Sequence, residues 1–287
     1  MKRNYRAVKL LCPRFVGRAE LWARARARAA SPFDQKWHLL RGGGNLILNG
    51  MRSQQVRAIA GVGAAASYVL SHIVLGTDGT AEAVDDAAIT GPVPVAVSAT
   101  TYPTQTSLRV EALLDSATAN GVVFQEMGLR MANGILVARK AFPAITKSSL
   151  FEWLMRWTIS VATPVPAGGA TVTLLGIEHL LKLLANDDVT NRPVNRMQFG
   201  TGSDAAVPAD MVLQTPITPV KDIVDRTEGA YSVLLRAFLL AGEGNGFPIA
   251  ETGLLAPNGG LIARATFAEQ AKDSDHILGF SWLLESL

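Results

Sequence analysis

Apolar and polar residues alternate along several stretches of the chain, a period-2 pattern typical of β-strands that bury one face. The clearest alternation flanks two dipeptides, Asn133-Gly134 and Asn258-Gly259. Asn-Gly is a strong signal for a two-residue hairpin turn, because both residues tolerate positive φ. We therefore expect a β-hairpin about each dipeptide.

The two hairpins belong to a repeat with an offset of 125 residues. Residues 120–142 read NGVVFQEMGLRMANGILVARKAF and residues 245–267 read NGFPIAETGLLAPNGGLIARATF, with 11 of 23 positions identical. A candidate helix precedes each copy, at 50–60 and 176–185. Each copy therefore reads as a helix, a strand, a glycine-rich turn, a long connection, a strand, the hairpin and a last strand.

This pattern predicts a mainly β fold with short helices, of the α+β type. We expect two tandem homologous antiparallel β-sandwich-like domains, each led by a helix. The expected boundaries are a basic N-terminal arm over 1–44, a first repeat over 45–163, a linker over 164–170 and a second repeat over 171–287. The linker is rich in proline and glycine, as domain linkers often are.

Folding the first hairpin about its turn assigns each residue to a face. The core face of the two hairpins is expected to hold apolar side chains at equivalent positions, namely Leu129, Leu136, Ala138, Phe142, Leu254, Leu261, Ala263 and Phe267. This assignment follows from the alternation of side chains along paired strands.

The opposite face of each hairpin carries charge. It brings Gly128 against Arg139, with Glu126 one diagonal step away. Glycine leaves room for the arginine to reach the carboxylate, so we expect a Glu126–Arg139 ion pair and, in the second copy, a Glu251–Arg264 pair. A hairpin clamp or subunit contact is the favoured role for these pairs; a catalytic carboxylate is the alternative.

Charge is distributed unevenly along the 287 residues. The net charge is +3, yet residues 1–57 contain 13 Lys/Arg and two acids, and the rest is acidic overall. We expect an arm that orders only on assembly and docks into an acidic neighbour. The docking residues are those of the basic run, Arg14, Arg18, Trp22, Arg24, Arg26 and Arg28.

Two other kinds of partner for the arm, a membrane surface and nucleic acid, are less favoured by the sequence. The run is Ala-rich and permits a helix, but arginines two apart on a helix fall on nearly opposite sides, which disfavours a membrane-surface helix. Nucleic acid remains an alternative, although no recognition motif accompanies the charge. The longest apolar run, 59–75, is too short to cross a bilayer, and no signal peptide is expected, so folding is expected in a reducing cytoplasm.

No catalytic constellation emerges, and neither an enzyme, a cofactor nor a metal is expected. A single cysteine, Cys12, excludes an internal disulfide and a cysteine-ligated zinc site. The four histidines lack metal-ligand spacing. The glycine cluster Gly42–Gly44 is interpreted as a turn. The three tryptophans that recur near the end of each copy are interpreted as core or interface residues rather than a sugar platform, namely Trp153, Trp157 and Trp282.

The repeated string resembles a bacteriophage family. It is similar to the tail-collar or tail-fibre N-terminal attachment domain of contractile-tail phages, whose core reads G-x-x-I-x-E-x-G-L-x-x-x-x-G-x-L-x-A. Here that core falls on Gly121–Ala138, with Phe124 where isoleucine is usual, and on Gly246–Ala263, with Ile249 in place. The resemblance covers about 110 residues of each half.

The resemblance implies a virion structural protein, assembled in the host cytoplasm, that attaches or adapts fibres to the tail, baseplate, collar or neck. It implies other virion proteins as partners and a homo-oligomer, with a trimer as the expectation. Three alternatives stay open: a receptor- or carbohydrate-binding tail module, a head-to-tail connector with its basic arm near DNA, and a polysaccharide-degrading enzyme.

Overall fold

The computed structural model describes residues 2–25, 36–162 and 169–286, and it confirms a mainly β fold with short helices. The strands are antiparallel throughout the described residues except where β1 (Lys2–Leu11) lies parallel to β18 (His276–Glu285). The chain divides into two compact units. Unit 1 comprises Met1–Arg14, Arg52–Ala66 and Ala162–Leu287, and unit 2 comprises Phe15–Met51 and Ser67–Val161.

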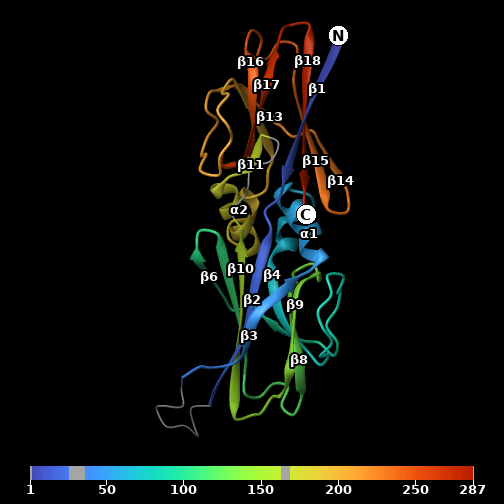
Figure 1. Ribbon diagram of the computed structural model, residues 1–287, viewed down its shortest axis with the longest axis vertical. Helices are drawn as coiled ribbons and strands as arrows, with labels where there is room; N and C mark the ends of the chain where they lie inside the picture. The colour runs from blue at the N-terminus through green and yellow to red at the C-terminus, as the bar shows by residue number, and fades with distance from the viewer. Residues whose placement is uncertain (1, 26–35, 163–168, 287) are drawn as a thin grey trace. The chain divides into compact units, whose positions relative to one another are not determined.

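Unit 2 is one curled nine-stranded sheet around an apolar core (Figure 1). Its order is β5-β4-β8-β9-β3-β2-β10-β7-β6. In chain order these strands are β2 (Phe15–Ala25), β3 (His38–Ile47), β4 (Leu70–Gly76), β5 (Val93–Ala96), β6 (Ala99–Thr104), β7 (Ser107–Leu114), β8 (Val123–Met131), β9 (Leu136–Thr146) and β10 (Phe151–Val161). In the core, the rings of Phe124 and Trp153 meet edge to face with centroids 5.8 Å apart.

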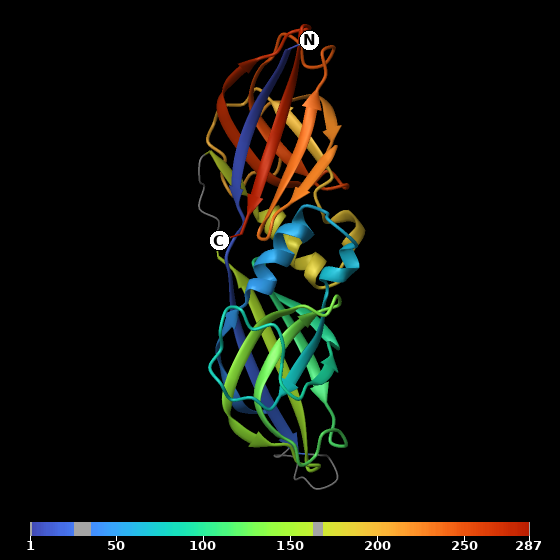
Figure 2. The same cartoon turned by 90° about the vertical axis from the view of Figure 1, so that its right-hand side faces the viewer.

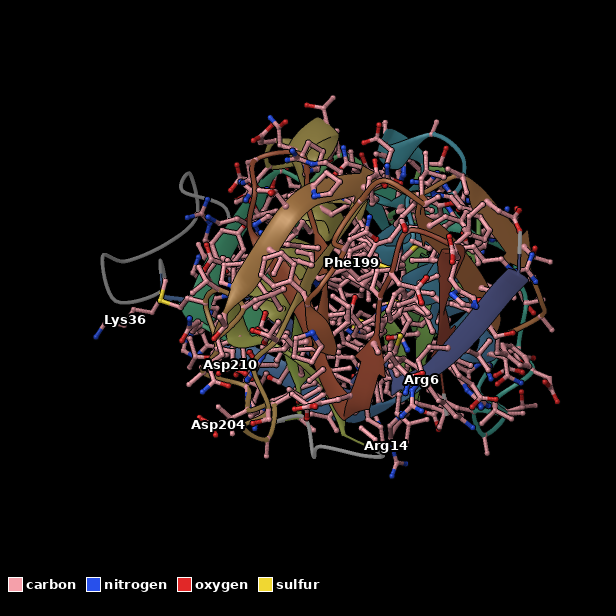
Figure 3. All side chains as sticks on the ribbon, turned by 90° about the horizontal axis from the view of Figure 1, so that it is seen from above. Arg6, Arg14, Lys36, Phe199, Asp204 and Asp210 are labelled. Carbon is pink, nitrogen blue, oxygen red and sulfur yellow. The ribbon has the colours of Figure 1, made fainter. Side chains whose placement is uncertain are left out.

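Unit 1 is built from two sheets. One has the order β1-β18-β15-β14, with β15 (Ser232–Leu239) and β14 (Asp225–Glu228). The other has the order β11-β17-β16-β12-β13, formed by β11 (Ala170–Val172), β17 (Leu261–Ala271), β16 (Pro248–Leu255), β12 (Arg196–Gly200) and β13 (Pro216–Asp222). The sheets pack through Phe199 and Phe280, whose ring centroids lie 4.6 Å apart; Figure 3 labels Phe199 in the interior.

The two copies follow the same order of strands. Strands β4 to β10 correspond one by one to β12 to β18, and the match extends to register, because Leu46 pairs with Arg139 just as Thr171 pairs with Arg264. Helices α1 (Asn49–Ile59) and α2 (Leu174–Leu184) begin one or two residues before their expected starts. Short 3₁₀ helices follow at Ala65–Tyr68 and Val189–Asn191.

The compact units do not follow the expected boundaries between repeats. Helix α1 stands at the head of the first copy, yet from Arg52 onward it belongs to unit 1. There the Ile59 carbonyl accepts a hydrogen bond from Val194 N at 2.7 Å, and Arg57 pairs with Glu228 at 2.6 Å. Of the expected linker, residues 164–168 lie outside the described residues, and Ala170 already belongs to β11.

The N-terminal region is not an arm that orders only on assembly, because its described residues form strands. Strand β1 lies along β18 over its whole length, as Figure 2 shows, and β2 lies between β10 and β3. The alternation of alanine and arginine in β2 permits a helix locally. In the fold the same period-2 pattern buries Ala19, Leu21 and Ala23 in a strand, because tertiary burial outweighs helix propensity.

Two turn predictions need correction. Gly42–Gly44 lie inside β3, paired with β2, rather than in a turn. Asn133-Gly134 does form the hairpin turn, but in a loop of three residues: Met131 N donates to the Ile135 carbonyl at 3.0 Å, and Gly134 has a φ of 87°. Such a loop contains a glycine bulge. The second hairpin repeats it at Asn258-Gly259, where Gly259 also has a φ of 87°.

The bulge changes one core assignment in each copy. It shifts the register after Leu129, so Leu136 lies on the Gly128 face instead of beside Leu129. A Cβ added to Gly128 would lie only 2.6 Å from Leu136 Cδ1. The space beside the glycine is therefore filled by a leucine, not by the arginine as expected. Leu261 stands in the same relation to Gly253.

Candidate functional site

A buried ion pair lies on the hairpin of each copy, as the sequence predicts. Arg139 Nε donates to Glu126 Oε2 at 2.7 Å, and Arg264 Nε donates to Glu251 Oε2 at 2.8 Å. All four side chains are at most 3% exposed. Each arginine also binds an aspartate from the loop that follows the first strand of its copy, at 2.9 Å for Asp86.

The glutamate of each pair holds both ends of that loop. Glu126 Oε1 accepts from Asp78 N at 3.3 Å and from Thr90 N at 2.9 Å. In the second copy, Glu251 Oε1 accepts from Gly202 N at 3.1 Å and from Thr215 N at 2.7 Å. The repeated Glu-x-Gly-Leu string thus clamps a loop onto the hairpin, a wider role than joining two strands.

The electrostatics of the pair suit a permanent clamp. Burial by itself lowers the pKa of Arg139, but its hydrogen bonds to Glu126 and Asp86 outweigh burial and raise that pKa above the ordinary value. The same balance, with Asp210 and Glu251, raises the pKa of Arg264. Both guanidinium groups stay charged, and both glutamates accept several hydrogen bonds, an arrangement that holds the loop firmly on the hairpin.

A second buried cation is duplicated, and sequence reasoning missed it. Lys147 Nζ donates to the carbonyls of Ser148 and Phe151 at 3.0 and 2.7 Å. Lys272 Nζ donates to Asn245 Oδ1 at 2.8 Å. Both lysines are buried, and burial lowers the pKa of each. The available signal was the repeat itself, because the two lysines match at the same offset of 125 residues.

Unit 2 also carries a surface where several arginines meet. We call it the arginine face and define it as the outward side chains Arg18, Trp22, Arg24, Arg109 and Arg156. They come from β2, β10 and β7, which are neighbours in the sheet. Residues two apart share a face on a strand, so Arg18, Trp22 and Arg24, which would be scattered around a helix, lie on one face of β2.

Pairing across the strands divides the arginine face into rows. In one row, Arg156 lies between two acids: its partner on β7 is Glu111, which it binds at 2.7 Å, and its partner on β2 is Glu20. In the next row, Thr158 has Arg18 on one side and Arg109 on the other, with no acid in that row. The Arg18–Thr158–Arg109 row holds no acid of its own, but Arg18 Nε binds Glu20 Oε1 of the neighbouring row at 2.8 Å. Arg109 is therefore the arginine of that row without a carboxylate partner among the described residues.

Arg109 is the arginine whose charge stays most available. Its Nε donates to Thr158 Oγ1 at 3.4 Å, and among the described residues no carboxylate lies within ion-pair distance of it. It lines an open depression of about 430 Å³ together with Arg18, Thr158 and Ser160. By contrast Arg24 is engaged by Glu152 at 2.9 Å, and its guanidinium also stacks on the Trp37 ring.

The other predicted residues fall in different places. Arg14 follows β1 and belongs to unit 1, and Arg26 and Arg28 lie outside the described residues. Trp153, Trp157 and Trp282 are at most 2% exposed, so they are core residues and not an exposed platform.

The remaining candidates for reactive groups are held in local contacts. His276 Nδ1 lies 2.6 Å from Asp273, and burial raises the pKa of the Cys12 thiol to about 12. Over the described ranges, no group of three or more His, Cys, Asp or Glu side chains is placed to hold a metal ion.

Comparisons with known proteins identify no relative of this chain. The chain matches no protein-family model, and searches of curated proteins and of solved structures likewise give no match. No helix of the described residues is long and apolar enough to span a membrane.

Proposed function

We propose that the protein is a structural component of a tailed-phage virion. It attaches or adapts fibres or other appendages to the tail, baseplate, collar or neck through protein–protein interfaces. The proposal rests on the resemblance of Gly121–Ala138 and Gly246–Ala263 to the tail-collar and tail-fibre attachment domain. It also rests on what those residues do in the fold.

The supporting observation is the duplicated clamp. The charged pair of the repeated string is buried and engaged: Arg139 is 3% exposed, and Glu126 accepts from it and from two backbone amides. A residue pattern repeated in this way builds a rigid frame with a fixed loop. Rigid frames that present loops and sheet faces suit assembly, because binding then orders little additional chain.

The arginine face is the proposed docking surface for an acidic neighbour. Arginine is enriched in protein interfaces, and charge-assisted hydrogen bonds to carboxylates are stronger than neutral ones. Glutamates such as Glu20 and Glu111 interleave with the arginines. Such alternation fits a folded partner with its own pattern of charge better than it fits a uniform phosphate backbone.

A connector role close to DNA is the second candidate. It is favoured by Arg109, which lies beside Arg18 and has no carboxylate partner among the described residues. The two candidates differ in salt dependence. Binding to duplex DNA weakens steeply with salt in proportion to the number of phosphates contacted, whereas a patterned protein interface weakens less. Measuring retention on duplex DNA and on purified particles at two salt concentrations separates them.

The proposed function is tested by locating the protein in the virion. Purified particles are labelled with an antibody against the chain and imaged, and the native mass of the isolated protein is measured. We expect label at the tail, baseplate, collar or neck and a mass three times that of the 30.5 kDa chain. Particles that contain none of the protein would overturn the virion role, and a monomer would overturn the expected trimer alone.

A further inference from the structure

The clamped loop differs between the two copies in a way that opens a site in the second. Residues 77–91 and 201–215 align without gaps, each running from a threonine to the residue before a proline. Asp78 of the first loop is replaced by Gly202. The exposed pair Ala87-Ala88 is replaced by Met211-Val212, and both of these large apolar side chains are 72% exposed.

The clamp arginine loses partners through the same change. Arg139 Nη2 has two acceptors in its own loop, Asp78 Oδ2 and Thr80 Oγ1, each at 3.5 Å. Arg264 keeps its bonds to Glu251 and Asp210, but its Nη2 is buried without any hydrogen-bond partner. A buried donor with no acceptor is unfavourable, and a ligand that supplies one gains that energy back.

The second loop cannot supply the missing acceptor at the position of Asp78. A Cβ on Gly202 would lie 2.6 Å from Gln214 Cβ, so no side chain fits there. Asp204, at the position of Thr80, exchanges hydrogen bonds with Gln214 instead of Arg264. The second loop therefore leaves Arg264 Nη2 without an acceptor.

A pocket lies against this arginine. It has a volume of about 550 Å³, and its polar lining comes from Arg264, Asp204, Asp210 and Gln214. Figure 3 labels the two aspartates, which lie on the same side of the molecule. Its apolar wall is formed by side chains of the second loop, namely Val207, Met211, Val212 and Leu213. The pocket thus offers one donor, carboxylate acceptors and an apolar wall.

We propose that this pocket binds a short basic and apolar segment of another polypeptide. A backbone carbonyl of the segment accepts from Arg264 Nη2, a lysine or arginine of the segment pairs with Asp204, and an apolar side chain packs on Met211 and Val212. The charge of the pocket favours a basic segment. Arg264 is already bound by Asp210 and Glu251, and Asp204 adds a further carboxylate to the lining, so the pocket is net negative and disfavours an acidic segment.

This site is independent of the arginine face. It belongs to unit 1 and selects a basic ligand, whereas the arginine face belongs to unit 2 and selects an acidic one. The loop of the first copy differs in both respects, because it carries Ala87-Ala88 and supplies acceptors to its own arginine. Duplication would thus have produced one closed and one open version of the same module.

The test uses the whole protein and two synthetic probes. These are acetyl-Gly-Leu-Lys-Leu-Gly-amide and the same peptide with glutamate in place of lysine. Binding is followed by NMR through the methyl signals of isotope-labelled methionine, valine and leucine, so that Val207 and Leu213 report binding where Met211 is replaced. We expect the lysine peptide to shift the Met211 signal in a saturable way, and the glutamate peptide to bind about tenfold more weakly or not at all.

Variants identify the groups responsible. Asp204→Asn is expected to weaken binding of the lysine peptide and so to narrow the difference in affinity between the two peptides. The double change Met211→Ala and Val212→Ala, which restores the residues of the first copy, should abolish binding as seen in the signals of neighbouring residues. Val224→Ala serves as the control, because Val224 is 64% exposed and does not line the pocket.

Three results would overturn the site. They are equal binding of the two peptides, no saturable shift with either, or an effect of Val224→Ala as large as that of the double change. Each of these leaves the virion role untouched, since that role is tested by location in particles.

Discussion

Val8 and Trp282 are partners in the parallel ladder that joins the first strand of the chain to the last. Strand β1 completes a sheet of unit 1, and after a short connection β2 enters the sheet of unit 2. Val8 and Leu10 are buried in this arrangement. Strands β1 and β2 of the basic N-terminal region therefore contribute to the cores of the two units, and Arg18 and Arg24 lie on a sheet surface.

The first prediction concerns the contribution of β1 to unit 1. Leu10 is 1% exposed, so Leu10→Ala should lower the free energy of unfolding by about 2–4 kcal/mol through lost burial and the cavity left behind. This loss of stability is measured from the transition of unit 1 in urea unfolding. The matched control is the neighbouring Lys9→Ala: that side chain is 59% exposed, and its ion pair with Glu285 should contribute about 1 kcal/mol or less. Equal effects of the two changes would show that β1 does not pack in the core.

The second prediction concerns the loop clamp. Glu126→Ala leaves Arg139 buried with one carboxylate fewer and frees the amides of Asp78 and Thr90. Breaking a buried pair of this kind costs about 3–5 kcal/mol. We expect faster hydrogen exchange at those two amides in addition to the lower stability, whereas Glu126→Gln, which still offers an acceptor, should show a smaller effect. Unchanged exchange in Glu126→Ala would mean that the loop is held by other contacts.

The duplicated ion pairs were accessible from sequence for a specific reason. An ungapped repeat fixes the same register in two hairpins, and a glycine facing an arginine near a glutamate then predicts which charges meet. The same reasoning misplaced Leu136, because a turn of three residues inserts a bulge that two-residue pairing does not contain. A local pattern predicts a strand, but a single inserted residue changes which face of the sheet the following side chains occupy.

The arginine face was less accessible. The row Arg18–Thr158–Arg109 joins three strands that are distant in sequence, and nothing local specifies that β10 lies between β2 and β7. Strands with little burial were missed as well: β6 is exposed along its whole length and therefore shows no apolar alternation. Apolar patterns in a sequence indicate which residues are buried. They do not predict which strands become neighbours, or which exposed strands pair only through their backbones.

The third prediction uses the buried lysines. Burial lowers the pKa of Lys147 from its ordinary value of 10.5. Between the lowered folded-state pKa and 10.5 the unfolded chain binds more protons than the folded one, so the stability contributed by this group rises with pH across that interval. Lys147→Met removes the titration and leaves the Ser148 and Phe151 carbonyls without their donor.

The measurable outcome is the stability difference between the wild type and Lys147→Met as a function of pH. The variant should be less stable at neutral pH, and the difference should widen as the pH rises toward 10.5. Lys272→Met should behave alike in unit 1, because burial lowers that pKa too. A difference that stays constant or narrows with rising pH would contradict the assignment.

The fourth prediction tests the arginine face during assembly. Arg109→Glu places a carboxylate in the Arg18–Thr158–Arg109 row, so a docked acidic neighbour would meet repulsion in place of attraction. The side chain is half-buried on a sheet surface, and the fold should tolerate the change. We expect incorporation of the variant into purified particles to fall more than tenfold relative to the wild type, a change that corresponds to about 1.4 kcal/mol or more.

The control for this change is Arg130→Glu, which reverses a half-buried arginine of the same unit on β8, outside the arginine face. Circular dichroism and unfolding curves establish that both variants are folded, and mass spectrometry of particles quantifies incorporation. If Arg109→Glu enters particles as well as the control does, the acidic neighbour does not dock at this face. If both variants are lost equally, the loss reflects charge reversal in unit 2 in general. Only a selective loss at Arg109 assigns docking to the row that Thr158 shares with Arg18. In that row Arg18 is already bound by Glu20, whereas Arg109 has no carboxylate partner among the described residues.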